Sequence, residues 1–391
     1  MRPVLTIPPT LQRRLLARAL GAASLLLASS AAAQDVAVDA FLPAPDQVGF
    51  TGFASSRTPG HLGTDATLWL DYGFRTLRIS GAQLVRHRFD GTVAAQLGIL
   101  SRGAIALRMP FLLYQRGDDA SAAPELAAAG AGNPALDGRV RLLGAGVRPD
   151  GSAADGAALA LRGIVHLPVG SSDAYFADDK WRTEVSAIAD IEMFGIGAGA
   201  AFGYRYRQPD ELEPIFPGGR ATPRLPPFAA EHVLRLSAGL RLPLPLFSRA
   251  WPGRVQESGL LEVDVQTPAT DFFADNFTPV EGRIGYRIGV GDLTGTLSFG
   301  AALRDAYGGP DFRTLLAVGW SPRQHDQDAD GVPDGADQCV HLPEDRDGFQ
   351  DDDGCADDDN DSDLIVDEDD RCPLEPAEMG RDDDEDGCTD P

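Results

Sequence analysis

The residues of this chain that could do chemistry of their own lie in its last part, from Asp326 to Pro391. All four cysteines are there, and the spacing of 33 residues between the first and third recurs between the second and fourth. Five aspartates precede the first cysteine of each pair at matching offsets: Asp326, Asp328, Asp330, Asp334 and Asp337, then Asp359, Asp361, Asp363, Asp367 and Asp370. A fixed period of this length predicts an array of small repeated units.

The aspartate spacing is typical of a calcium site, because Ca²⁺ takes six to eight oxygen ligands from carboxylates, backbone carbonyls and water. The aspartates from Asp326 to Asp337 occupy positions 1, 3, 5, 9 and 12 of a twelve-residue loop. Gly331 is at position 6, which gives the ligand order of an EF-hand loop. Nearby prolines and the lack of apolar helical periodicity argue against EF-hand helices. The second copy has Leu364 in place of this glycine, so its turn is costlier.

Two shorter units follow the long ones, and both end in Asp-x-Asp-Gly-Cys. They add six aspartates to the predicted ligands of Ca²⁺: Asp347, Asp351, Asp353, Asp382, Asp384 and Asp386. A long unit and then a short one, each closing on cysteine, resembles the thrombospondin type 3 repeat over residues 326–388. A disordered acidic tail that binds ions loosely is the alternative.

The resemblance implies repeats that wrap calcium ions with little regular secondary structure. It also implies the disulfide bonds Cys339–Cys355 and Cys372–Cys388, although four cysteines by themselves allow three connectivities. Disulfide bonds of this kind need an oxidising compartment.

The first 33 residues are typical of a secretory signal peptide. A leader with four arginines precedes a short apolar stretch, residues 19–28, and residues 31–33 fit an A-x-A cleavage site. The mature chain is then expected to begin at about Gln34. Residues 34–67 form a lead-in segment, and they could be either a periplasmic lead-in or a plug.

The negative charge belongs almost entirely to the tail. The chain has 59 acidic and 34 basic residues, and 28 of the acids but only 3 of the bases lie from Asp326 onward. The remainder is balanced and offers no basic patch, which argues against nucleic acid as a partner. No His-x-x-x-His or serine-elbow motif occurs, so we do not expect an enzyme.

The middle of the chain alternates apolar and polar residues with a period of two, which predicts strands with two different faces. Twelve such segments are expected at residues 68–79, 86–99, 103–114, 138–148, 156–168, 182–194, 196–207, 231–244, 257–267, 279–290, 294–304 and 311–320. Most have the length at which a tilted strand crosses a bilayer, and the connections tend to alternate between short and long. The pattern predicts an all-β fold, an antiparallel transmembrane β-barrel of about twelve strands over residues 68–320, followed by an irregular calcium-binding tail, residues 321–391.

A soluble β-sandwich or barrel that buries its leucine-rich face is the competing interpretation. The length of the strands, the absence of cysteine from the body, and aromatic residues at strand ends favour the membrane: Tyr114, Phe194, Tyr206 and Trp320. The inward arginines could favour anionic solutes: Arg108, Arg205, Arg235, Arg241 and Arg287. They could equally pair with inward acids and close the lumen: Glu184, Asp190, Glu192, Glu262 and Asp264.

Residues 84–115, residues 308–313 (GGPDFR) and residues 320–322 (WSP) look like the OmpA-type outer-membrane proteins of myxobacteria and their relatives. Those proteins carry a barrel, then thrombospondin type 3 repeats, then often a peptidoglycan-binding domain. The resemblance covers residues 84–390 and implies an outer-membrane location. The sequence up to Pro391 contains no peptidoglycan-binding domain, so anchoring to the cell wall by that route is not expected from the resemblance.

We therefore expect an outer-membrane β-barrel with a structural or porin-like role, whose partners are outer-membrane lipid, calcium and a periplasmic or cell-envelope component. An even strand number places both barrel ends on one side, which in this family is the periplasm, so the tail is expected there. The alternative is an exported, calcium-dependent adhesion or interaction protein with a soluble β-body.

Overall fold

The computed structural model describes residues 41–79, 82–100, 102–117, 129–144, 146–148, 152–171, 176–208, 231–251, 255–322, 328, 332, 337–345, 347, 349–350, 353–377, 381 and 386–389. The expected signal peptide therefore lies outside the described residues. The chain divides into two compact units: Arg323–Pro391 with Pro149–Ser152 form one, and the remainder up to Pro322 forms the other. No helix within the described part is long and apolar enough to cross a membrane.

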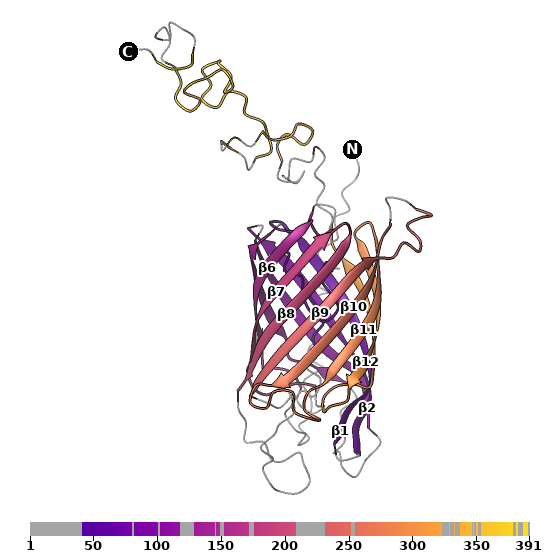
Figure 1. Cartoon of the computed structure of the whole chain (residues 1–391). Helices are drawn as coiled ribbons and strands as arrows, with labels where there is room; N and C mark the ends of the chain where they lie inside the picture. Colours follow the sequence, from indigo (N-terminus) through magenta and orange to yellow (C-terminus); the bar gives the residue numbers. More distant parts are fainter. Residues whose placement is uncertain are drawn as a thin grey trace, which may run out of the picture. The chain divides into compact units, whose positions relative to one another are not determined.

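The first unit is a closed antiparallel β-barrel of twelve strands, as the alternation predicts (Figure 1). The strands are β1 (Thr64–Ile79), β2 (Ala82–Ile99), β3 (Gly103–Arg116), β5 (Ala135–Leu143), β6 (Gly156–His166), β7 (Arg182–Met193), β8 (Ile196–Arg207), β9 (His232–Pro243), β10 (Val255–Pro268), β11 (Val280–Val290), β12 (Leu293–Arg304) and β13 (Phe312–Trp320). Each strand pairs with the next, β3 pairs with β5, and β13 pairs with β1 to close the sheet. A two-residue strand, β4 (Gly130–Ala131), pairs with β3 beside β5.

Strand boundaries differ from the predicted ones where small residues weaken the period-two pattern. β1 begins at Thr64 rather than at residue 68, because its first outward positions are Thr64 and Ala66, which give no apolar signal. β5 covers Ala135–Leu143 instead of residues 138–148. It ends where Gly144 has a φ of +83°, a backbone conformation that a residue with a side chain rarely adopts.

The two faces of the sheet are those that the sequence predicts. Residues that lie opposite one another on neighbouring strands form a row across the outer face of the barrel. The large residues of this row are exposed: Ile191, Leu240, Leu261, Ile284 and Phe299. The alternate residues point inward and are mostly charged or small. The four aromatic residues expected at strand ends are all exposed: Tyr114, Phe194, Tyr206 and Trp320.

The connections differ between the two ends of the barrel. At one end the turns after β2, β7 and β11 span only a few residues. At the other end the described parts of the loops include residues 167–171, 176–181, 269–279 and 305–311. The hairpin of β1 and β2 is the longest and extends below the neighbouring strands in Figure 1.

Candidate functional site

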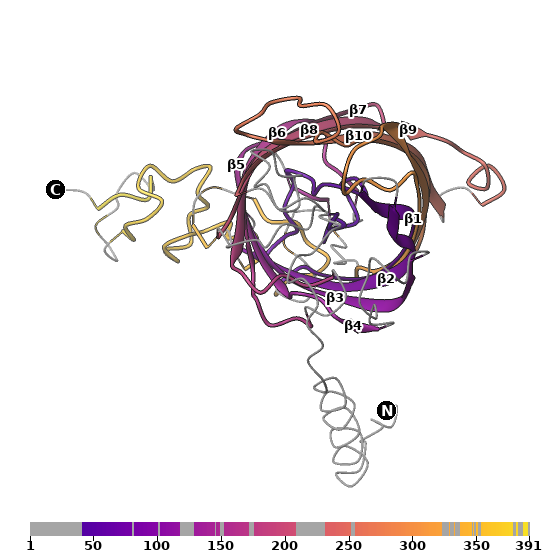
Figure 2. The same ribbon diagram turned by 90° about the horizontal axis from the view of Figure 1, so that it is seen from below.

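The interior of the barrel contains residues 41–59, here called the plug segment. Viewed along the barrel, this indigo segment before β1 lies inside the ring of strands (Figure 2). It has no helix or strand, yet most of its residues are buried. Of the two possibilities left open for residues 34–67, the structure therefore favours a plug for residues 41–59.

A buried irregular backbone is stable only if its polar groups find partners. The plug segment supplies some of these itself, because it folds back so that the Ala44 N–H donates to the Thr51 carbonyl at 3.0 Å. The Asp46 carboxylate lies at the centre of this fold, where it accepts from the Gly49 N–H at 2.6 Å and from the Ser55 N–H at 3.1 Å.

Two carboxylates of the wall bind donors of the plug segment. Glu262 on β10 accepts hydrogen bonds from the N–H and hydroxyl of Thr51, both at 2.8 Å, and from the Gly52 N–H at 3.0 Å. Asp190 on β7 accepts from the Ser55 hydroxyl and the Ser56 N–H, both at 2.7 Å. It also pairs with Arg57 at 3.1 Å. Hydrogen bonds to a charged group contribute about 1.5–3 kcal/mol each, so these contacts hold the segment in place.

Arginines of the wall bind the acceptors of the same segment. Arg287 on β11 donates to the carbonyls of Gln47 and Gly49 at 2.6 and 2.7 Å, and Arg241 on β9 donates to that of Val48. Further donors are Arg235 to Gly52, Arg108 to Pro43, and Arg139 to both the Asp46 carboxylate and the Ser55 carbonyl. The plug segment is thus bound through opposite chemistry by acids and bases of the wall.

Two glycines on the inner face make room for an aromatic side chain. Phe50 stacks on Phe53 with ring centroids 4.6 Å apart, and its ring faces Gly199 on β8 and Gly239 on β9. A Cβ atom at Gly239 would lie 2.5 Å from the Phe50 ring, and one at Gly199 would lie 2.6 Å from it. Any larger residue at either position would therefore displace the ring.

The start of the plug segment packs on an apolar patch of the wall. Phe41 contacts the buried cluster of Trp69, Leu315 and Ala317, and the Trp69 indole N–H donates to the Ala44 carbonyl at 3.1 Å. The Arg313 guanidinium lies 4.3 Å from the centroid of the Phe41 ring. Three cavities between the segment and the wall have volumes of only about 10, 20 and 40 Å³. Each of these can hold a few water molecules at most.

Of the five inward arginines named from the sequence, three pair with inward carboxylates, as one of the two expectations has it, whereas Arg287 donates to carbonyls of the plug segment. Arg235 pairs with Asp264 at 3.0 Å and Arg241 with Glu192 at 2.6 Å. Arg108, however, pairs with Asp137, which the sequence interpretation had not selected. Asp137 also pairs with Arg162, at 2.6 Å.

The sequence interpretation did not identify the plug contacts, since no periodicity marks residues 41–59. The feature of the sequence that could have indicated a plug is the inward-facing glycines in the middle of long strands. A lumen lined by arginine and glycine has space at the glycines that either water or another part of the chain can fill.

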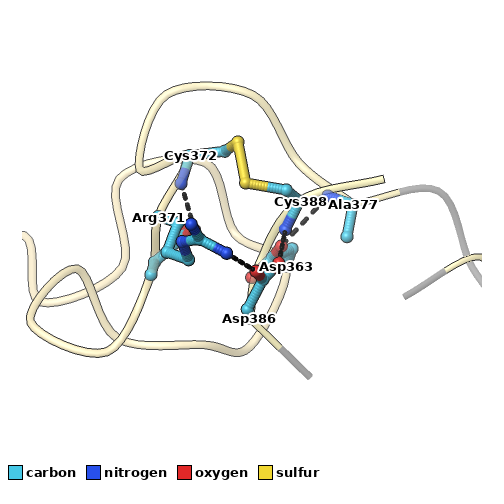
Figure 3. The surroundings of a disulfide bond; sticks show 7 residues. Asp363, Arg371, Cys372, Ala377, Asp386 and Cys388 are labelled. Atoms are coloured by element: carbon cyan, nitrogen blue, oxygen red, sulfur yellow. Dashed lines mark hydrogen bonds and ion pairs between the residues drawn. A yellow bond between two sulfur atoms is a disulfide. The ribbon is translucent and has the colours of Figure 1, made fainter. Parts of the chain in front are cut away.

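The tail unit repeats its local geometry. Disulfide bonds join Cys339 to Cys355 and Cys372 to Cys388, the pairs that the family resemblance implies. In both repeats an aspartate carboxylate accepts from the N–H of the cysteine two residues later, at 2.6 Å for Asp337 and 2.7 Å for Asp370. Figure 3 shows the second disulfide bond with the neighbouring Asp386, which pairs with Arg371 at 2.7 Å.

Several carboxylates of the tail are arranged as cation ligands would be. One oxygen each of Asp359, Asp361 and Asp363 lie within 4.8 Å of one another. The carboxylate oxygen Oδ2 is buried and accepts no hydrogen bond in each of Asp337, Asp361 and Asp370. Partial burial raises the pKa of Asp361, and the Asp363 carboxylate raises it further by repulsion. A divalent cation would satisfy these oxygens and relieve the repulsion.

The structure brings together part of the predicted ligand set. Asn360 bridges two further members, since its side chain donates to Asp347 at 2.6 Å and also to Asp367. Asp353 and Asp386 accept from the cysteines that follow them, both at 3.1 Å. Six predicted ligands lie outside the residues that the structure describes: Asp326, Asp330, Asp334, Asp351, Asp382 and Asp384. Asp328 is among the described residues, but the predicted ligands nearest to it in the sequence are not.

No protein-family model and no curated protein matches this chain. Among solved structures it is similar to an outer membrane channel from Pseudomonas putida F1, with 10% identity and a TM-score of 0.44 over 68% of this chain and 97% of that one. It is also similar to the NanC porin, with 10% identity and a TM-score of 0.38 over 66% and 98% of the two chains. The KdgM porin in complex with disordered oligogalacturonate has 5% identity and a TM-score of 0.38, over 65% and 98%.

Gly239→Ala is expected to loosen the plug segment, because its methyl group would overlap the Phe50 ring. Overpacking of this kind costs about 1–3 kcal/mol. The midpoint temperature of the heat-induced gel-mobility shift should fall, and Phe50→Ala in the same chain should recover part of the loss. Gly259→Ala is the matched control, because a Cβ there meets its nearest atom at an ordinary 3.5 Å. Equal midpoints for the two alanine variants would contradict the packing argument.

Leu364→Gly is expected to strengthen calcium binding by the second long repeat. Leu364 has a φ of +81°, and this left-handed conformation costs a non-glycine residue about 1–2 kcal/mol. Glycine loses more conformational entropy than leucine when the loop becomes ordered, which offsets part of this relief. The binding free energy for calcium should therefore improve by about 1 kcal/mol, or roughly fivefold in affinity. Calcium titration calorimetry of the variant measures it, and an unchanged or weaker affinity would show that the turn does not limit binding.

Proposed function

We propose that this chain is an outer-membrane β-barrel of the porin-like kind, closed at rest by the plug segment, with a calcium-binding tail. The observation that carries the proposal is the radial distribution of side chains. Apolar residues face out from every side of a closed barrel, while buried charges and a buried irregular segment fill the inside.

A bilayer location is supported by the outward row of Ile191, Leu240, Leu261, Ile284 and Phe299, all exposed. In water this surface would be an extended apolar patch, whereas hydrocarbon is its natural environment. Closure of the sheet leaves no unpaired edge strand, which is the condition for crossing a bilayer with strands. Exposed aromatic residues at strand ends fit the interfacial girdle.

A closed resting state is supported by the contents of the lumen. The plug segment contacts β7 through Asp190 and β10 through Glu262, and it reaches β5 through Arg139. The three cavities that described residues of the segment and the wall line together are smaller than any nutrient solute. Conduction therefore requires that residues 41–59 move.

The plug segment can be locked and loosened by single contacts. The Ser55 hydroxyl lies 2.7 Å from the Asp190 carboxylate, so the side chains of the double variant S55C/D190C lie near each other, and oxidation is expected to join them in a disulfide bond after a small shift of the segment. Glu262→Ala removes three hydrogen bonds to the segment. In planar bilayers we expect the oxidised cysteine variant to conduct least, to recover with dithiothreitol, and Glu262→Ala to open more often than the wild type.

The matched control is Glu281→Ala, because Glu281 pairs with Arg283 and Arg313 of the wall. Wild-type protein with and without dithiothreitol controls for reduction of the tail. Equal opening of the Glu281 and Glu262 variants, or equal conductance of the locked and reduced cysteine variants, would refute closure by residues 41–59. A mature protein that is monodisperse in buffer with no detergent would refute the membrane location.

For the tail we propose calcium binding in the manner of thrombospondin type 3 repeats. The clustered oxygens of Asp359, Asp361 and Asp363 and the donor-free oxygens of Asp337 and Asp370 support it. The chemistry is all oxygen, which suits Ca²⁺ rather than a softer metal. Since the barrel has an even number of strands, we also propose that the tail is periplasmic, where it would serve as a calcium-ordered spacer.

Calcium removal is expected to expand the isolated tail, because 28 acids then repel one another against only 4 bases. Small-angle scattering of residues 323–391 with calcium and with EDTA measures the change. Asp361→Asn should weaken calcium binding, while Asp358→Asn, at an exposed neighbouring carboxylate outside the predicted ligand set, should change it far less. Identical scattering curves with calcium and with EDTA would end the calcium proposal.

The second candidate is an adhesion or interaction role for the calcium-binding repeats. A periplasmic tail excludes contact with other cells, so protease treatment of intact cells distinguishes the two. Loss of the tail under that treatment would favour adhesion and overturn the periplasmic placement.

A further inference from the structure

We propose that three arginines of the barrel wall, Arg139, Arg241 and Arg287, form a binding site for solutes that carry several anionic oxygens, and that the plug segment occupies this site as an internal ligand. The inference rests on the proposed closure of the lumen by residues 41–59. It adds the class of solute that the barrel takes and the reason why this solute would release the segment.

The three guanidinium groups come from different sides of the barrel and converge on four consecutive plug residues. Arg139 is on β5, Arg241 on β9 and Arg287 on β11. They bind the Asp46 carboxylate at 2.6 Å, the Val48 carbonyl, and the carbonyls of Gln47 and Gly49. A ligand that replaces residues 46–49 would therefore meet three cationic groups at once.

The groups that the plug segment offers to these arginines are all oxygen acceptors, and one of them is a carboxylate. Asp46 accordingly occupies the position that an acidic group of a solute would take beside Arg139. Arg287 donates to both carbonyls from one nitrogen, Nη1, and its planar guanidinium group has the further N–H donors that suit carboxylate, sulfate or phosphate.

The charge of the wall favours anions over cations. Eleven arginines on the described strands are buried, against six buried carboxylate residues. The excess of arginines over carboxylates becomes smaller when four half-buried carboxylates are included: Asp65, Asp90, Asp190 and Glu281. It becomes larger again with the half-buried Arg141 and Arg241. A narrow lumen with positive walls concentrates anionic solutes, because the field is focused by low-dielectric surroundings.

An anionic solute competes with the plug segment because both bind the same three arginines. A solute with several carboxylates replaces neutral carbonyl acceptors with charged ones, and charge-assisted hydrogen bonds are roughly twice as strong as neutral ones. Binding of such a solute to the three arginines displaces residues 46–49. Its concentration then controls how often the lumen is open.

Trp69 provides a direct readout of plug release. Its side chain is 2% exposed, it packs with Phe41 and its indole N–H donates to the Ala44 carbonyl, so release of the segment would expose it to water. The other three tryptophans are on the outside and can be replaced by phenylalanine: Trp181, Trp251 and Trp320. In this full-length single-tryptophan protein, citrate should shift the emission to the red, whereas spermidine and sucrose should not.

The triple variant R139Q/R241Q/R287Q tests the site. We expect at least about a tenfold higher citrate concentration for half of the red shift, because charge-assisted hydrogen bonds are lost. The matched control R75Q/R148Q/R304Q removes three arginines that pair with carboxylates outside the plug segment, Asp311, Asp155 and Asp275, and it should respond like the parent. Heat-modifiable gel mobility establishes that each variant is folded.

Selectivity is measured separately in full-length Phe50→Ala, which loosens the plug segment without changing any charge of the wall. Its reversal potential in a potassium chloride gradient should indicate preference for chloride, and the arginine triple variant should reduce that preference. A loosened channel that opens but prefers potassium, or a red shift equal for citrate, spermidine and sucrose, would overturn the anion site while leaving closure by residues 41–59 intact.

Discussion

The structure depends on the pairing of guanidinium groups that are buried in the lumen. A buried charge without hydrogen-bonding partners is strongly destabilising, and the buried carboxylates of the wall are fewer than its arginines. The backbone carbonyls of the plug segment make up part of the difference, as at Arg287, whose contacts at Gln47 and Gly49 are both carbonyls. The irregular segment is therefore part of how the wall itself is stabilised.

The same requirement explains which parts of the fold are predictable from the sequence. Strands of the barrel alternate between an apolar outer face and a polar inner face, so the predicted bounds of β8 are the observed ones, Ile196–Arg207. Prediction failed where the outward residues are small, as at Ala66, and where one glycine ends a strand, as at Gly144. A period-two pattern carries information only where the two faces differ in chemistry.

The contents of the lumen could not be predicted in this way. Ser55 binds Asp190 across 135 residues, and Gly49 binds Arg287 across 238. Such partners are brought together only by closure of the barrel, and no local pattern records them. In the tail, by contrast, Asp337 binds the N–H two residues later and each disulfide bond joins cysteines 16 residues apart. Contacts that are local in sequence appear as a visible repeat, and the family that this repeat resembles implies the observed disulfide pairs.

The plug segment is held by two sets of contacts, and an anion can compete with only one of them. The arginines bind its carbonyls and Asp46, whereas Glu262 and Asp190 bind its N–H groups, hydroxyls and Arg57. A dissolved anion replaces the first set but offers nothing to the second, so the two carboxylates determine how much anionic ligand is needed for release. In the proposed closure, acids and bases of the wall bind the same segment, so a polyanion competes with it more effectively than a monovalent ion, which can satisfy only one arginine at a time.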